Sequence, residues 1–197
     1  MPDWMRSGRR EAIVTACLLA GLALTTPAAR SADYRIAADH SHADFTVRLL
    51  WLHTINGRFT QIAGQLRTDP RGLATVDARI AVNSVVTDSA RFRRWMLAPE
   101  FFDATHYRTI HFVSAPVALS VLSSGGTLDG QLSMRGVTRP IRFELMPSAC
   151  GAIAAGGCVI EAHGTLARGE FGMNSHRTVL SDQVQLGLRI TFNPAAG

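Results

Sequence analysis

LDGQLSMRGVTRPIRFEL, residues 128–145, alternates apolar and polar side chains in two runs that are separated by Arg135 and Gly136. Successive side chains of a strand point to opposite faces, so this period of two predicts a β-hairpin with one apolar and one polar face. A helical period would mix both kinds of side chain on each face, which argues against a helix. The apolar face consists of Leu128, Gly130, Leu132, Met134, Ile141, Phe143 and Leu145.

Similar one-sided segments recur along the chain, with turn residues between them. The odd-numbered positions from Phe45 to Phe59 are mostly apolar, and we expect one long strand that bends near Asn56 and Gly57. About eight strands result, a number that closes an antiparallel barrel just wide enough to hold a ligand. The predicted fold class is therefore all-β, an eight-stranded antiparallel barrel. The remaining strands are expected over residues 74–82, 110–114, 117–122, 159–166 and 184–192.

One segment breaks the strand pattern. In residues 88–98, Asp88 or Ser89 can cap a helix start, and Phe92, Trp95 and Met96 follow at helical spacing. We predict one short helical insert that acts as a lid or plug. Trp95, with the Phe101–Phe102 pair that follows it, is expected at the mouth of the barrel.

The N-terminal residues resemble a secretory signal peptide. Basic residues precede an apolar run over residues 13–24, and Ala29-Arg30-Ser31 is a small-x-small cleavage site. We predict a signal peptide over residues 1–31, one barrel domain over residues 32–197, and a periplasmic or secreted mature protein that begins near Ala32. The apolar run is shorter than the about 20 residues that span a bilayer. A retained anchor and lipidation at Cys17 are the less favoured alternatives.

Two cysteines, Cys150 and Cys158, remain after cleavage of the predicted signal peptide. Export to an oxidising compartment favours a structural disulfide between them. A metal-binding or redox-active pair is the alternative. The seven intervening residues match neither a CxxC motif nor a zinc-knuckle spacing.

Composition and motifs argue against several function classes. The formal net charge of +5 comes from arginines alone, since the chain has no lysine, and they are scattered, which does not indicate a nucleic-acid surface. No G-x-S-x-G elbow, HExxH helix, phosphate-cradling glycine loop or close carboxylate pair is present. We expect no enzymatic activity and no cofactor apart from a bound ligand.

Two stretches carry a resemblance to a known family. GQLSMRGVTR, residues 130–139, is similar to the G-x-L-x-x-R-G-V-T-K/R turn of the YceI-like family, and FFDATHYRTIHFVS, residues 101–114, is similar to its F-F-D-x-x-x-Y-P-x-I-x-F-x-S segment. His40–Ser41, Gly57-Arg58-Phe59 and Phe171–Gly172 agree as well, so the resemblance covers nearly the whole predicted mature chain. The chain departs from the family pattern at Ala37, Leu49 and Arg108.

The resemblance implies a lipocalin-like barrel that holds the apolar tail of a polyisoprenoid, an isoprenoid quinone, a polyprenyl phosphate or a similar long-chain lipid. It also implies that two barrels could pair as a homodimer. Inward and mouth residues would then contact the lipid, although the same residues would form the core of a barrel packed shut. The predicted lipid-binding residues are Phe45, Val47, Leu49, Trp51, Ile55, Phe59, Trp95, Phe101, Phe102, Phe112, Leu132, Met134 and Phe143.

Two other hypotheses stay open at this point. His40 and His42, with Asp44, share one face if this segment is a strand, and an H-x-H pair can chelate zinc or copper; His53, His111 or His163 could supply a further ligand. An exported metal-binding or redox-assisting protein is therefore the alternative function, and a purely structural β-domain is the third.

The expected insert could also meet a pyrophosphate or an anionic membrane surface in a transient contact, although exposed arginines are more often simply solvated. These arginines are Arg91, Arg93 and Arg94.

Overall fold

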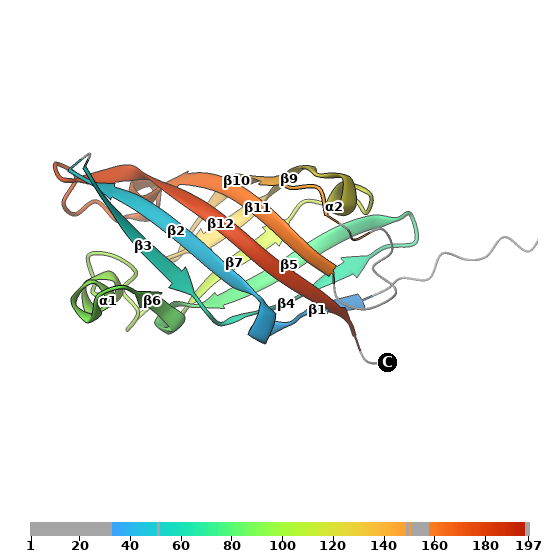
Figure 1. The fold of residues 1–197 in the computed structure, drawn as a ribbon, viewed down its shortest axis with the longest axis horizontal. Helices are drawn as coiled ribbons and strands as arrows, with labels where there is room; N and C mark the ends of the chain where they lie inside the picture. Colours follow the sequence, from blue (N-terminus) through green and yellow to red (C-terminus); the bar gives the residue numbers. More distant parts are fainter. Residues whose placement is uncertain (1–32, 51, 149, 151–157, 196–197) are drawn as a thin grey trace, which may run out of the picture.

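The computed structural model describes residues 33–50, 52–148, 150 and 158–195. The predicted signal peptide and Trp51 lie outside these residues. Eight antiparallel strands form a closed ring, which confirms the predicted barrel (Figure 1). In spatial order the ring consists of β1 (Asp33–Ile36), β4 (Ile62–Thr68), β5 (Leu73–Ala81), β7 (Thr109–Ser114), β9 (Gly126–Met134), β10 (Val137–Leu145), β11 (Cys158–Ala167) and β12 (Leu180–Pro194).

The other elements extend or cover this ring. Strand β2 (His42–Leu49) pairs with β12, β3 (His53–Phe59) with β2, and β6 (Val85–Thr87) with β3, while β8 (Val117–Ala118) pairs with β5. The helices are α1 (Ala90–Leu97) and α2 (Val121–Ser124), with 3₁₀ turns η1 (Ala38–His40), η2 (Val82–Ser84) and η4 (Arg168–Phe171). Helix α1 and the β2–β3 connection lie at one end of the barrel and α2 at the other, here called the α1 end and the α2 end (Figure 1).

Strand β12 closes the barrel along its whole length. One edge pairs with β11, and the other pairs first with β2 and then, over its last three residues, with β1. Strand β1 also pairs with β4, so it bridges the last strand of the chain to the start of the meander. Two separate N-terminal strands therefore share one edge of the C-terminal strand.

The hairpin over residues 128–145 is confirmed in register and turn. Val137 pairs with Met134, and the two residues between them, Arg135 and Gly136, both have positive φ, of 53° and 74°. Two-residue hairpin turns of this kind match the twist of the flanking strands. The predicted helix is confirmed too, with the Ser89 side chain accepting a hydrogen bond from the Arg91 amide at 3.2 Å. Among the described residues, no helix has the length and apolar character needed to cross a membrane.

Three expectations about the strands were wrong. The predicted long strand from Phe45 to Phe59 is a hairpin of β2 and β3. Only the first two residues of the strand expected over 117–122 are strand, and α2 follows, with the Ser123 and Ser124 hydroxyls bonded to the carbonyl of Ser120. Strands β1 and β4 were not predicted. The predicted number of eight strands is right because β1 and β4 take the places in the ring that were expected for residues 45–59 and 117–122.

Aromatic rings inside the barrel lie over glycines on neighbouring strands. A Cβ atom built on each of these glycines would sit less than 3 Å from the ring, so only glycine leaves the ring room to lie against the sheet. The pairs are Phe45 over Gly57, Phe112 over Gly130 and Phe143 over Gly164. Flattened rings occupy less of the barrel's cross-section than upright ones, which helps to keep its centre open.

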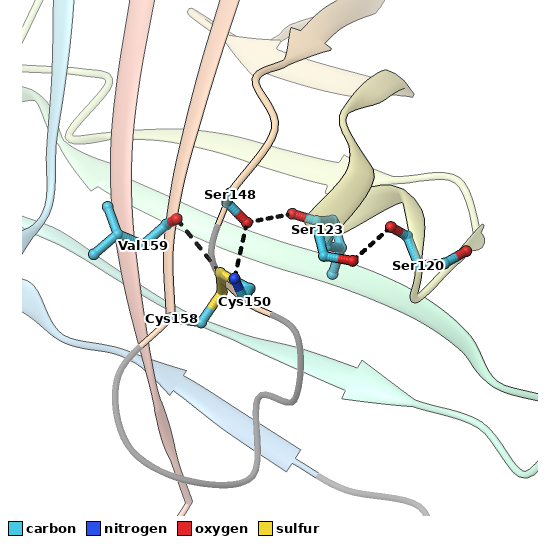
Figure 2. Close-up of a disulfide and its surroundings, with 7 residues drawn as sticks. Ser120, Ser123, Ser148, Cys150, Cys158 and Val159 are labelled. Carbon is cyan, nitrogen blue, oxygen red and sulfur yellow. Dashed lines mark hydrogen bonds between the residues drawn. A yellow bond between two sulfur atoms is a disulfide. The ribbon is translucent and has the colours of Figure 1, made fainter.

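The α2 end is tied shut by covalent and polar contacts. The predicted disulfide between Cys150 and Cys158 is present, with a Cα–Cα distance of 5.2 Å, and residues 151–157 lie outside the described part (Figure 2). The Ser148 hydroxyl donates to the carbonyl of Leu122 at 2.9 Å, and the Ser148 amide donates to the carbonyl of Ser123 at 2.8 Å. Leu122 is fully buried, so these bonds hold α2 across this end of the barrel.

Candidate functional site

An apolar cavity of about 170 Å³ occupies the centre of the barrel. Its lining comes from almost every strand and from α1, and among the residues that the structure describes Asp44 and Arg168 are its only charged members. The Asp44 carboxylate accepts hydrogen bonds from Arg58, whose side chain is exposed. Within the described part of the chain, Arg168 therefore supplies the one charged side chain that is buried beside the cavity. Such a space suits an uncharged hydrocarbon ligand.

The barrel interior is not packed shut. Several inward residues of β5 and β12 line the cavity yet are only partly buried. Small residues contribute to the space, since Ala43 and Ala162 pair with Leu188 on its two sides and each lacks the bulk to fill the centre. The partly buried lining residues of these two strands are Ala78, Ile80, Val184, Leu186, Leu188 and Ile190.

The cavity gathers most of the residues that the sequence singled out. Leu49 packs against the core without lining the cavity, and Trp51 lies outside the described residues. Sequence reasoning missed the walls that β5, β11 and β12 supply, although the alternation over residues 184–192 already marked the inner positions of β12. The predicted residues that line the cavity are Phe45, Val47, Ile55, Phe59, Trp95, Phe101, Phe102, Phe112, Leu132, Met134 and Phe143.

Aromatic side chains close the α1 end of the cavity. The Trp95 ring lies 4.4 Å from the ring of Phe101 and 5.1 Å from that of His176, measured between centroids. Phe102 contacts Phe45 edge-on, with ring centroids 6.0 Å apart. Trp95 and Phe102 are only half-buried and line the cavity at the same time, whereas Leu122 seals the opposite end. The α1 end is therefore the candidate mouth.

The turn between β9 and β10 holds the segment that carries Phe101 and Phe102. The Arg135 guanidinium donates to the carbonyls of Pro99, at 2.8 Å, and of Phe101. Its carbon lies 6.0 Å from the ring centroid of Tyr107, which in turn covers Gly136. Residues 98–107, here called the lid segment, are thus fastened to the barrel by the Arg135–Gly136 turn, which lies in the stretch that carries the family resemblance.

Arg168 is a buried cation bonded to backbone carbonyls. It is 2% exposed, and its guanidinium donates to the carbonyls of Met173, Ser181 and Leu180 at 2.5, 2.9 and 3.1 Å. Burial lowers the pKa of Arg168, and nearby Asp182 acts in the opposite direction. The Met173 carbonyl belongs to the connection that follows η4, and those of Leu180 and Ser181 belong to the start of β12, so Arg168 fastens this connection to the barrel wall.

The proposed metal ligands are not brought together. His40 lies in η1, whereas His42 and Asp44 lie on β2, with 3.6 Å between the His42 Nε2 and an Asp44 carboxylate oxygen. Arg58 binds the same carboxylate through two hydrogen bonds of 2.5 and 2.9 Å, and this contact raises the pKa of Arg58. Over the described residues, no three His, Cys, Asp or Glu side chains form a group that could hold a metal ion.

Solved structures share this architecture. BcnA from Burkholderia cenocepacia superposes with a TM-score of 0.68 at 16% identity, over 79% of this chain and 98% of that one. A polyisoprenoid binding domain from Saccharophagus degradans, implicated in plant cell wall breakdown, gives a TM-score of 0.65 at 16% identity, over 82% and 98%. At such low identities these likenesses establish the fold only.

Sequence comparison extends over nearly the same region. Protein YceI of Salmonella arizonae is 28% identical over 176 residues, which cover 85% of this chain and 90% of that protein. The YceI-like domain model matches residues 34–192, from the second residue of β1 to the part of β12 that pairs with it. The match therefore includes every strand of the closed barrel and the lid segment, and the chain belongs to the YceI-like family.

Proposed function

We propose that this protein binds and carries the apolar tail of a long-chain lipid, of the polyisoprenoid or isoprenoid-quinone class, in the central cavity. The observation that carries the proposal is the apolar lining of the cavity, in which inward residues of β5 and β12 are only partly buried. The Saccharophagus degradans domain, described as polyisoprenoid binding, shares the fold and supports the class of ligand. The proposed role is binding and not catalysis.

Burial of the tail supplies the affinity. Each methylene removed from water contributes roughly 0.8 kcal/mol, so a five-carbon isoprene unit contributes about 4 kcal/mol before the costs of ordering are subtracted. Hydrocarbon offers no directional bonds, so selection would come from the shape of the cavity. Small lining side chains such as Ala78 and Ala162 leave room for the methyl branches of an isoprenoid chain.

We further propose that the protein works after export, in the periplasm or outside the cell. The Cys150–Cys158 disulfide supports this location, because disulfides persist mainly in oxidising compartments. The signal-like pattern of residues 1–31 supports it as well. A carrier there would keep a poorly soluble lipid dispersed in water.

The decisive experiment is native mass spectrometry of protein purified from its own cells, followed by extraction and identification of any bound lipid. A long-chain isoprenoid bound at one per protein supports the proposal. Lipid-free protein would then be titrated with a polyprenyl alcohol and with a straight-chain alcohol of equal carbon number. Stoichiometric zinc or copper that is lost in His42→Ala, with no bound lipid, would contradict the proposal.

A further inference from the structure

Exposed apolar side chains are concentrated at the α1 end. Six large apolar side chains are well exposed in the part of the chain that the structure describes, and only Met146 lies toward the α2 end. Gathered exposed apolar surface marks sites of contact with a partner or a membrane. The other five are Leu50, Leu52, Val86, Phe92 and Tyr107.

Two of these residues, Leu50 and Leu52, belong to the β2–β3 connection, here called the tip, which lies at the α1 end (Figure 1). Leu52 is 86% exposed and Leu50 is 51% exposed. Leu50 also has a φ of 50°, in the left-handed region that leucine adopts at a cost and that asparagine or glycine adopts more easily. Its amide donates to the carbonyl of Val179 at 2.7 Å, so the backbone of Leu50 is held in place. Core packing does not explain an exposed leucine in this conformation.

A basic hollow lies directly beside this tip. Between the pairs Leu180↔Leu49 and Val184↔Val47, strand β12 has three residues where β2 has only Arg48, and this bulge opens a surface depression of about 500 Å³. Arg48 and Arg177 line the depression together with Leu50. Asp182 lies 3.8 Å from Arg177 and is the acidic residue of the hollow. The depression thus combines two guanidinium groups with an apolar rim.

Helix α1 adds further cations on the other side of the mouth. Arg91 and Arg94 are exposed, and neither forms an ion pair with any residue that the structure describes. Asp88 and Glu100 are the acidic residues at the two ends of this helix region. Phe92 is exposed between the two arginines in sequence, so apolar and basic groups alternate here as they do at the tip.

We propose that the α1 end docks on the surface of an anionic lipid bilayer. Leu50, Leu52 and Phe92 enter the interface, and Arg48 and Arg177 contact lipid phosphates. Apolar anchors surrounded by basic side chains are the combination that binds anionic membrane surfaces. In this orientation Trp95 and Phe102 face the bilayer, so an apolar tail moves between bilayer and cavity without crossing water. Docking itself does not depend on what the cavity holds.

The test uses lipid-free full-length mature protein and flotation with vesicles of phosphatidylcholine, with or without phosphatidylglycerol. Binding is expected to the mixed vesicles and to weaken in high salt. Arg48→Gln and Arg177→Gln each lower the partition coefficient about fivefold. Leu50→Asn, which tolerates the positive φ, combined with Leu52→Ser lowers it about tenfold or more.

Matched control variants carry the same changes at the α2 end. Met146→Ser replaces an exposed apolar residue there, and Arg67→Gln replaces an exposed arginine on β4, so both should leave vesicle binding unchanged. The proposal is overturned if the protein fails to float with mixed vesicles, or if the control variants weaken flotation as much as the tip variants do. It is also overturned if Leu50→Asn/Leu52→Ser turns a dimer into a monomer in sedimentation while flotation persists, because the surface would then pair two copies. Because the vesicles contain no isoprenoid, failure of this assay leaves the proposed binding of an isoprenoid tail untouched.

Discussion

Filling the central cavity should have opposite effects on stability and on ligand affinity. Ala78 lies on β5, lines the cavity and is only partly buried. An unfilled apolar cavity costs about 24 cal/mol per Å³, so the 170 Å³ space corresponds to about 4 kcal/mol of lost stability in the lipid-free protein. Ala78→Leu places three further apolar carbons in this space. We expect it to raise the free energy of unfolding by about 2 kcal/mol.

The same three carbons occupy volume that a lipid tail would need. Displacing an equal stretch of tail removes about 2 kcal/mol of binding free energy, which weakens the affinity roughly thirtyfold. Urea unfolding of the lipid-free protein measures the first effect. Titration with a polyprenyl alcohol, followed by tryptophan fluorescence, measures the second.

Ala63→Leu is the matched control, because Ala63 is exposed on the neighbouring strand β4 and pairs with Arg79. It should leave both quantities nearly unchanged. If Ala78→Leu lowers stability while the affinity for the alcohol stays at the wild-type value, the cavity is not the tail site and the reasoning from its unfilled space is refuted.

Three other perturbations test separate parts of the structure. Cys150→Ser removes the disulfide and should lower the free energy of unfolding by about 2.5 kcal/mol, measured in urea, without changing lipid affinity. Arg135→Asn keeps the left-handed turn but loses the bonds to the lid segment, so amide hydrogen exchange over residues 98–107 should accelerate; unchanged exchange would show that other contacts hold the lid. The hydrogen bond from Arg142 lowers the pKa of Asp129. The ionised Asp129 therefore contributes stability above the ordinary Asp pKa, and this contribution is lost as the pH falls through the lowered pKa. Asp129→Asn should make the free energy of unfolding depend less on pH below about pH 4.

The alternation of side chains predicts faces well but does not detect a reversal of direction. In the β2–β3 hairpin, Phe45 pairs with Gly57 and Val47 with Ile55, so odd positions stay on the inner face after the chain turns. The connection contains no glycine, proline, asparagine or aspartate to mark the turn. One long strand and two antiparallel strands therefore have the same pattern, and only tertiary pairing distinguishes them.

The candidate site was predictable where residues are large and was missed where they are small. Aromatic positions such as Phe112 and Phe143 stand out in sequence, and both line the cavity. Hollow space depends instead on Ala78 and Ala162, and on the distance between strands that are far apart in the chain. Composition and periodicity carry no information about that distance. The basic hollow beside Arg48 arises from a bulge, which also depends on pairing with β12.

Because β12 is the last strand and pairs with both β1 and β2, the order of synthesis opposes early folding. The Thr191 amide bonds to the Ser41 hydroxyl across 150 residues of chain, and the ring cannot form until that distance has been closed. Contacts of such long sequence separation slow folding, since the loss of chain entropy precedes the gain from pairing. The barrel thus stays open until β12 is available, and deletion of β12 would leave β1 and β2 each with only one of their two neighbouring strands.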